Sequence, residues 1–370
     1  MPVPAGAPAL PVGLETPCLV VDLDVVERNA ERMARELRGR HVALRPHVKT
    51  HKSVRLARVQ VAGGAAGITV GTLGEAEVMV AGGIDDIFVA YPLWAAGTKA
   101  ARLRALHDRE RLRLAVGLDS VAAARLLSAA LHGNGREARV LVEVDPGNRR
   151  TGVRPEEAGE LGRAAAALGL EVVGAFTHGG HAYAGRDAVP GAASDEVAAL
   201  TVAADSLRRA GIEPQVLSAG SSPTALAAAS SPVSEVRPGT YLVGDRQQVA
   251  LGATPPAAVA LAVAATVVST AVDGQVVVDA GAKSLTKDVP VYLRGHGYLP
   301  QYPDAVLERL SDYHGVVTFP AASRRPALGE VVAIIPNHAC PVIDLYDTFI
   351  ATRSGDVVGR WPVDARGRSG

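Results

Sequence analysis

The chain has 370 residues, of which 48% are hydrophobic and 21% charged, and its 38 basic and 38 acidic side chains give a formal net charge of zero. This length exceeds that of the usual single domain, so we expect two domains or one barrel with an appended domain. The balanced charge removes the electrostatic basis for binding nucleic acid or an anionic membrane.

The first residues and the cysteine content indicate a cellular compartment. Residues 1–11 lack a basic stretch followed by an apolar core, which is the pattern of an export signal. No apolar run approaches the ~20 residues that span a bilayer. The two cysteines, Cys18 and Cys340, cannot form a disulfide framework. We therefore expect a cytoplasmic protein without a membrane partner.

Along most of the chain, short β-rich runs alternate with longer helical segments, which is typical of βα units on a parallel sheet. Eight strands are predicted, at 42–48, 66–70, 86–91, 112–117, 139–145, 171–177, 215–219 and 235–242. Helices are predicted between them, for example at 73–82, 119–132, 156–168 and 195–211. Because no glycine-rich dinucleotide motif follows the first strand, eight units favour a (β/α)8 barrel over an open doubly wound sheet.

The pattern of residue types in the sequence changes after about residue 255. Val-rich alternation broken by Gly and Pro predicts a β-domain, with strands at 262–270, 275–279, 290–293, 330–335 and 342–351. We therefore expect a barrel over residues 14–250 and a C-terminal β-domain over residues 255–370.

The segment Arg45-Pro46-His47-Val48-Lys49-Thr50 follows an apolar lead-in at the first predicted strand. The segment places a single lysine, Lys49, at a strand end, where a buried amine can lose its proton and act as a nucleophile. The alternative interpretation is a solvated basic turn. Lys49 is the candidate Schiff-base lysine.

A turn with two arginines follows the fifth predicted strand, in Asp145-Pro146-Gly147-Asn148-Arg149-Arg150-Thr151-Gly152. A guanidinium held there can lie against a ring nitrogen, and because it stays protonated it keeps that nitrogen uncharged. A surface turn with two solvated arginines is the alternative.

Small residues and hydroxyls follow the seventh predicted strand, in Ser218-Ala219-Gly220-Ser221-Ser222-Pro223-Thr224. Backbone N–H groups and hydroxyls at a strand end suit a phosphate. Barrels of this type often bind phosphate after strand seven or eight.

Two imidazoles and a phenol follow the sixth predicted strand, in Thr177-His178-Gly179-Gly180-His181-Ala182-Tyr183.

A second cluster lies in the predicted β-domain, where His338 and Cys340 are two residues apart. On a strand such residues face the same way and can converge on one ion. Two protein ligands and waters form an open metal site, whereas the alternative is a buried cysteine beside a capping histidine.

Taken in this order, the motifs resemble those of the D-threonine aldolase and D-serine dehydratase family, which has the alanine racemase fold and uses pyridoxal phosphate. The similarity runs from about Leu14 to Arg366. The resemblance implies a role for each motif: Lys49 binds the cofactor, Arg150 faces its ring nitrogen, Gly220 and Ser221 hold its phosphate, Tyr183 lies beside it, and His178 or His181 acts on the substrate.

The resemblance also implies that His338 and Cys340 bind a divalent metal. Cysteine stands here where some known aldolases of the family carry aspartate, a pattern more familiar from the dehydratases. Since a thiolate favours zinc and a carboxylate favours manganese or magnesium, zinc or manganese is expected.

We therefore expect a lyase, dependent on pyridoxal phosphate and a divalent metal, that acts on D-β-hydroxy-α-amino acids. In the aldolase type, His178 or His181 acts as base and cleavage gives glycine and an aldehyde. In the dehydratase type, Lys49 removes the Cα proton and the products are a keto acid and ammonia. A racemase and a cofactor-carrier protein without turnover are the remaining alternatives. The partner is a small D-amino acid, and a homodimer is expected.

Overall fold

The computed structural model describes residues 8–133 and 135–370, so most of the segment inspected for an export signal lies outside the described residues. The chain forms two compact units. We call the first, which contains Glu31–Lys49, Leu56–Gly239 and Gly367–Gly370, the barrel unit. The second, the β unit, contains the chain up to Ala30, Thr50–Arg55 and Thr240–Arg366.

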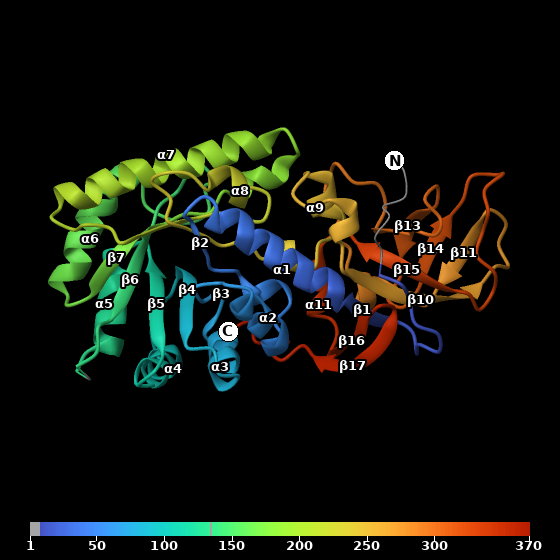
Figure 1. The fold of residues 1–370 in the computed structure, drawn as a ribbon, viewed down its shortest axis with the longest axis horizontal. Helices are drawn as coiled ribbons and strands as arrows, with labels where there is room; N and C mark the ends of the chain where they lie inside the picture. Colours follow the sequence, from blue (N-terminus) through green and yellow to red (C-terminus); the bar gives the residue numbers. More distant parts are fainter. Residues whose placement is uncertain (1–7, 134) are drawn as a thin grey trace. The chain divides into compact units, whose positions relative to one another are not determined.

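The barrel unit contains an eight-stranded parallel sheet in the order β2-β9-β8-β7-β6-β5-β4-β3 (Figure 1). Its strands are β2 (Ala43–Leu44), β3 (Ile68–Val70), β4 (Asp86–Pro92), β5 (Arg113–Leu118), β6 (Arg139–Glu143), β7 (Glu171–Phe176), β8 (Val216–Ala219) and β9 (Glu235–Val236). A parallel bridge between His47 and Thr69 joins the two ends of this order. Thr69 N donates to Pro46 O at 2.8 Å beside it, so the sheet closes into a barrel. The expected (β/α)8 fold is confirmed.

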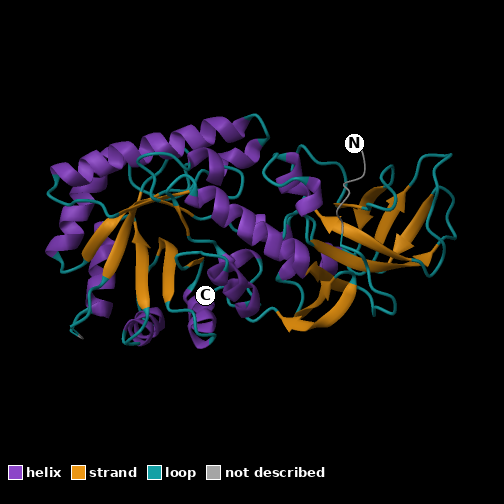
Figure 2. Ribbon diagram, in the orientation of Figure 1, coloured by secondary structure: helices purple, strands orange, loops and turns teal. Residues whose placement is uncertain are grey.

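Helices connect and cover these strands (Figure 2). They are α1 (Leu23–Arg38), α2 (Val54–Ala62), α3 (Leu73–Ala81), α4 (Thr98–His107), α5 (Val121–Leu131), α6 (Ala158–Ala167), α7 (Ala188–Arg209) and α8 (Ala225–Ala228). Polar N-caps start two of them, since Thr72 accepts from Glu75 N and Ser120 from Ala123 N. Helix α7 begins earlier than the predicted residue 195, because Pro190 lies in its first turn, where a missing N–H costs nothing.

The β unit contains a nine-stranded sheet in which β1 (Cys18–Asp22) lies between β10 and β16. The other strands are β10 (Leu261–Ser269), β11 (Gln275–Val278), β12 (Gly297–Tyr298), β13 (Val306–Leu310), β14 (Gly315–Thr318), β15 (Val331–Pro336), β16 (Thr348–Arg353) and β17 (Asp356–Pro362). Short helices α9 (Arg246–Ala250), α10 (Ala282–Leu285) and α11 (Ala339–Ile343) interrupt them. Because β1 pairs here, the compact units divide the chain differently from the expected ranges 14–250 and 255–370.

Two strands predicted for the β unit are wrong in part. Residues 290–293 form a turn, in which Leu293 N donates to Pro290 O at 2.9 Å. Residues 342–347 contain the end of α11 and the turn after it, so only 348–351 of that prediction is strand. Proline explains both differences, because it lacks an N–H for a ladder yet is tolerated in the first turn of a helix, as at Pro341.

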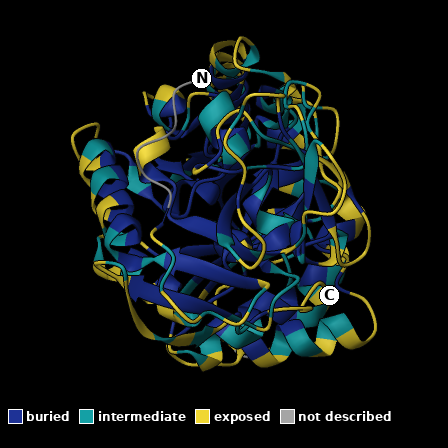
Figure 3. Cartoon of the chain, turned by 90° about the vertical axis from the view of Figure 1, so that its right-hand side faces the viewer, coloured by how far each residue is buried: buried dark blue, intermediate teal, exposed yellow. Residues whose placement is uncertain are grey.

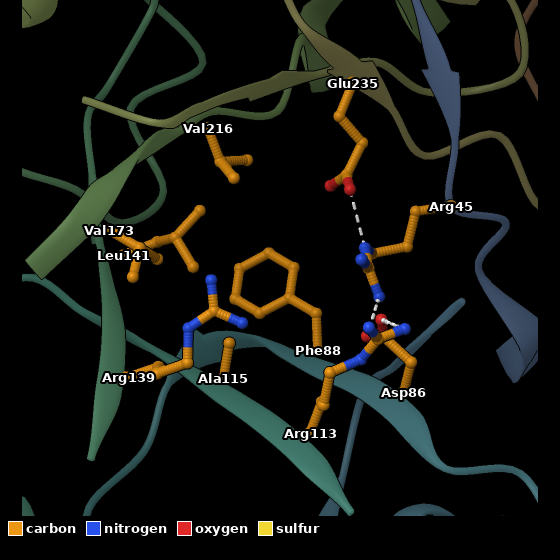
Figure 4. Close-up of a pocket in the computed structure, with 10 residues that line it drawn as sticks. All are labelled: Arg45, Asp86, Phe88, Arg113, Ala115, Arg139, Leu141, Val173, Val216 and Glu235. Atoms are coloured by element: carbon orange, nitrogen blue, oxygen red, sulfur yellow. Dashed lines mark hydrogen bonds and ion pairs between the residues drawn. The ribbon is translucent and has the colours of Figure 1, made fainter. Parts of the chain in front are cut away.

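Apolar side chains fill the interior, and the buried residues concentrate in the strands (Figure 3). In the barrel, Phe88 and Phe176 meet edge to face with ring centroids 5.0 Å apart. Arg45, which directly follows β2, binds residues at the amino ends of two other strands, Glu235 of β9 at 2.6 Å and Asp86 of β4 at 2.5 Å, around a cavity of about 40 Å³ (Figure 4). Burial lowers the pKa of Arg45, but the two carboxylates more than reverse this and raise it.

Candidate active site

Lys49 lies in a 3-10 turn, η1 (Val48–Thr50), and not at the end of a strand as predicted. Pro46 has no N–H to donate, so the regular strand stops at Leu44. Backbone bonding to the neighbouring strand nevertheless continues, because Arg45 N donates to Val236 O at 3.0 Å. The expected burial of the amine is also wrong, since Lys49 is exposed. Its side chain can therefore reach a ligand without rearrangement of the core.

His178 directly follows β7 and Thr177, at the carboxyl end of the barrel. Its ring hydrogen-bonds to the backbone of Gly220. The carbonyl is the acceptor, because the Gly220 N–H is donated to Glu196 at 2.9 Å. Burial lowers the pKa of His178 well below its ordinary value, and the positive charges of Lys49, Arg150 and Arg237 lower it further. The imidazole is therefore neutral at pH 7, with one ring nitrogen able to accept a proton.

His181 and Tyr183 lie in a second turn, η3 (Gly180–Ala184), and both are half-buried. His181 Nε2 is 3.1 Å from Asp195 Oδ2 on α7. The structure thus brings Lys49, Arg150 and His178 into one charged cluster, whereas His181 is paired with a helix carboxylate outside it.

The arginine turn after β6 is shaped by Asp145, whose Oδ1 accepts from Arg149 N at 3.0 Å. Arg149 has a left-handed φ of 55°, and the next side chain, Arg150, is 54% exposed. Arg150 Nη2 lies 4.0 Å from Oε1 of Glu143, a buried carboxylate at the end of β6. Burial raises the pKa of Glu143, while the Thr151 hydroxyl and Arg150 lower it. Glu143 is therefore a buried acidic partner of the exposed Arg150 guanidinium.

The predicted phosphate loop follows β8. Gly220 has a φ of +97°, and a Cβ there would come within 3.3 Å of Val236 and 3.4 Å of Arg237 N, so glycine fits the position best. Ser221 and Thr224 are buried, and Ser221 N donates to Thr224 Oγ1 at 3.0 Å. The amides of Gly220 and Ser221 are therefore used within the protein, and the Ser221 hydroxyl lies 3.1 Å from Thr224 Oγ1.

Arg237, which sequence reasoning missed, is fully buried just after β9. Its guanidinium donates to Ser218 Oγ at 2.7 Å and to Thr177 O at 2.5 Å. It also lies 5.4 Å from the ring centroid of Phe176. Burial lowers the pKa of Arg237 in spite of nearby carboxylates. Arg237, which follows β9, therefore links the ends of β7 and β8 through these hydrogen bonds.

His338 and Cys340 lie in the β unit, on a helix and not on the predicted strand. Strand β15 ends at Pro336, His338 is the N-cap of α11, and Cys340 is in its first turn. The two side chains nevertheless hydrogen-bond to each other. Cys340 Sγ is also 3.2 Å from Thr50 Oγ1.

The surroundings of this pair are acidic. His338 Nδ1 is 2.8 Å from Asp288 Oδ2. Burial lowers the pKa of His338, but the Cys340 thiolate, Asp245 and Asp288 raise it to about 10. Within residues 8–133 and 135–370, no group of three or more His, Cys, Asp or Glu side chains is arranged to hold a metal ion. The pair therefore fits an open site with two protein ligands, and not a closed structural zinc site.

Family models match both parts of the chain. The model described as alanine racemase, N-terminal domain, matches residues 21–247, and that described as putative serine dehydratase domain matches residues 260–352. The sequence is 36% identical to a D-threo-3-hydroxyaspartate dehydratase of Delftia sp. (strain HT23), over 94% of this chain and 97% of the relative. It is 33% identical to a D-threonine aldolase of Arthrobacter sp., over 99% and 97%. The chain belongs to the D-threonine aldolase and D-serine dehydratase family.

A solved structure of this family, D-threonine aldolase from Filomicrobium marinum, matches with a TM-score of 0.89 and 33% identity. The match covers 98% of this chain and 99% of that one. These relatives confirm the expected family and the expected enzyme class, a lyase. The alanine-racemase-like fold implies pyridoxal phosphate as cofactor. None of the helices that the structure describes is long and apolar enough to cross a membrane.

Proposed function

We propose that this family member is a lyase of D-β-hydroxy-α-amino acids that cleaves the Cα–Cβ bond to give glycine and an aldehyde. The observation that carries the proposal is the similarity to a D-threonine aldolase over nearly the whole chain. The hydrogen-bonded pair His338 and Cys340 supports a metal-dependent reaction. A homodimeric, cytoplasmic enzyme remains part of this proposal.

The residues at the carboxyl end of the barrel fit pyridoxal phosphate. The charges of Lys49, Arg150 and Arg237 that act on His178 also favour a phosphate dianion. Lys49 would hold the cofactor covalently, Arg150 would face its ring nitrogen, Tyr183 would lie beside the ring, and Ser221 would help to hold the phosphate. When bound, the cofactor supplies an electron sink for the bond broken at Cα.

His178 is the base in this proposal. Its ring N–H is donated to Gly220, so the other ring nitrogen can take a proton from the substrate hydroxyl. Its lowered pKa keeps that nitrogen unprotonated at neutral pH. His181 is less suited to the role, because its Nε2 is paired with Asp195.

His338 and Cys340 would hold the divalent metal, with zinc favoured by the thiolate. The bond from His338 Nδ1 to Asp288 fixes the ring and leaves Nε2 for the metal. His338 and Cys340 would both have to be deprotonated to hold the metal. When bound, the metal supplies Lewis acidity toward a hydroxyl oxygen.

A dehydratase is the second candidate, and a specific observation favours it. A D-threo-3-hydroxyaspartate dehydratase has solved structures of a histidine mutant and of a cysteine mutant two positions further along, the latter in a metal-free form. His338 and Cys340 have the same spacing. In this reaction Lys49 would remove the Cα proton and the β-hydroxyl would leave as hydroxide. The resulting enamine would tautomerise to an imine, which water hydrolyses to a keto acid and ammonia.

Product analysis with D-threonine and D-serine, with and without a chelator, tests the proposal. We expect glycine and acetaldehyde from D-threonine, and we expect chelator or His338→Ala to abolish turnover. Cys18→Ala is the matched control, because Cys18 is a buried core residue. A keto acid and ammonia as products would establish the dehydratase instead. Chelator-insensitive appearance of L-amino acid would establish the racemase, and bound cofactor without any turnover the carrier protein.

A further inference from the structure

Glu196 is a buried carboxylate that none of the roles above uses. It lies on α7, outside the barrel, and its side chain is 0% exposed. Its Oε1 accepts from Gly179 N at 2.7 Å and from Gly220 N at 2.9 Å. Gly179 follows β7 and Gly220 follows β8, so one oxygen holds the ends of two neighbouring strands.

The loops are shaped around this carboxylate. A Cβ on Gly179 would come within 2.8 Å of Glu196 Cδ, so only glycine allows the approach. Burial raises the pKa of Glu196, while hydrogen bonds from Thr224, Gly220 and Gly179 and the charge of Arg237 lower it. These hydrogen bonds from the loops thus offset the cost of burying the Glu196 carboxylate.

The Gly220 peptide connects Glu196 to the candidate base. Its N–H is donated to Glu196, and its carbonyl accepts from the His178 ring. Gly179, the other residue held by Glu196, is the neighbour of His178 in the chain. A shift of Glu196 would therefore move the phosphate loop and the histidine together.

We propose that Glu196 is a positioning residue that couples the phosphate loop, Gly220–Ser221, to the orientation and tautomer of His178. The inference rests on the proposed function, because it assigns both the loop and the histidine to one active site. It predicts that phosphate binding at the loop is sensed at the histidine ring.

The test compares two substitutions with similar volume. Glu196→Met removes the acceptor, whereas Glu196→Gln keeps an amide oxygen that can accept both N–H groups. Asp205→Asn, an exposed change on the same helix, is the control. Pyridoxal phosphate affinity is measured by titration of the apo proteins, and the His178 tautomer by ¹⁵N NMR.

We expect Glu196→Met to weaken pyridoxal phosphate binding roughly tenfold or more and to change the His178 tautomer, because two hydrogen bonds to a buried acceptor are lost. Glu196→Gln should restore both within a few-fold. If wild-type protein binds pyridoxal phosphate but Glu196→Met binds it equally well with an unchanged His178 ring, the inference is overturned. If wild-type protein does not bind the cofactor, the proposed function fails instead.

A second measurement applies if Glu196→Met does not fold. Adding pyridoxal phosphate to wild-type apo protein should shift the His178 ring resonances and slow amide exchange at Gly179 and Gly220 together. Cofactor binding that leaves the His178 ring and the Gly179 amide unchanged would overturn the coupling.

Discussion

The two ends of the barrel strands use charged side chains differently. At the amino ends, Arg45 binds Asp86 and Glu235, and Arg113 binds Asp86 as well, at 2.8 Å (Figure 4). At the carboxyl ends, the buried Arg237 donates instead to a hydroxyl and a backbone carbonyl. Arg237 is thus not bonded directly to a carboxylate, and Glu235, Glu196 and Glu143 act on its charge only through space.

This difference separates stability from function within one fold. Ions that neutralise one another at short distance hold strand ends together and offer little to a ligand. A guanidinium without a directly bonded carboxylate keeps more of its attraction for an anion such as a phosphate. The carboxyl ends are also where barrels of this type carry their catalytic groups.

The largest expected effect is at the carboxyl end. Lys49→Ala should abolish covalent attachment of pyridoxal phosphate and all turnover, because Lys49 is the exposed amine assigned to hold it. Its unfolding free energy should stay near that of wild type. Visible absorbance of the protein–cofactor adduct is the measurement, with Lys99→Ala as control. An adduct band that survives in Lys49→Ala would contradict the assignment.

Arg45→Met should have the opposite effect at the amino end. Removing the guanidinium leaves two largely buried carboxylates without their shared partner, which costs on the order of 3–5 kcal/mol of stability. Urea unfolding measures the loss. Pyridoxal phosphate affinity of the folded protein should be unchanged, so weaker cofactor binding without lost stability would break the comparison.

Arg150→Glu should have an intermediate effect, mainly on chemistry. A carboxylate facing the ring nitrogen favours its protonation, which makes the cofactor a stronger electron sink and changes the ratio of products. Arg150 is 54% exposed, but the new carboxylate would lie near the buried Glu143, so the free energy of unfolding should also fall by about 1 kcal/mol. Arg149→Glu is the control on the same turn. Identical spectra and product ratios for Arg150→Glu and wild type would make Arg150 a surface residue.

The smallest expected effect is a pH dependence at the amino end. Burial and the charge of Arg136 lower the pKa of His107 on α4. A lowered folded pKa means that the unfolded chain binds the proton first, so stability should fall as pH drops below about 6.5. The loss should level off below the folded pKa. The measurement is the free energy of unfolding in urea of wild type and His107→Gln between pH 5 and 8. Equal pH dependence of this free energy in the two proteins would contradict the prediction.

Much of the barrel could be predicted because its strands are local apolar runs. Each of the eight predicted runs overlaps an observed strand, although β2 and β9 have only two residues. The strand β1 could not be predicted to join the other sheet, because its partners on β10 and β16 are distant in the sequence. The helix at Cys340 was missed because Pro341 suits a first turn as well as a strand end.

The candidate site was predictable where residues form a motif and not where a single charge is buried. Glu143 ends β6 and Arg237 follows β9, and neither belongs to a recognisable sequence motif. Glu196 had a weak signal. It shares a helix face with the buried residues Ala192, Ala199 and Ala203, and an acid within such an apolar stripe indicates an inward role.

The place of β1 in the second sheet has a consequence for synthesis of the chain. Val20 pairs in parallel with Ile350, which leaves the ribosome 330 residues later. At roughly 5–20 residues per second, β1 waits tens of seconds for this neighbour while the barrel strands emerge one after another. During that time an apolar strand with unpaired edges is exposed on the nascent chain. Chaperone dependence of expression should therefore be governed by this short segment more than by the barrel.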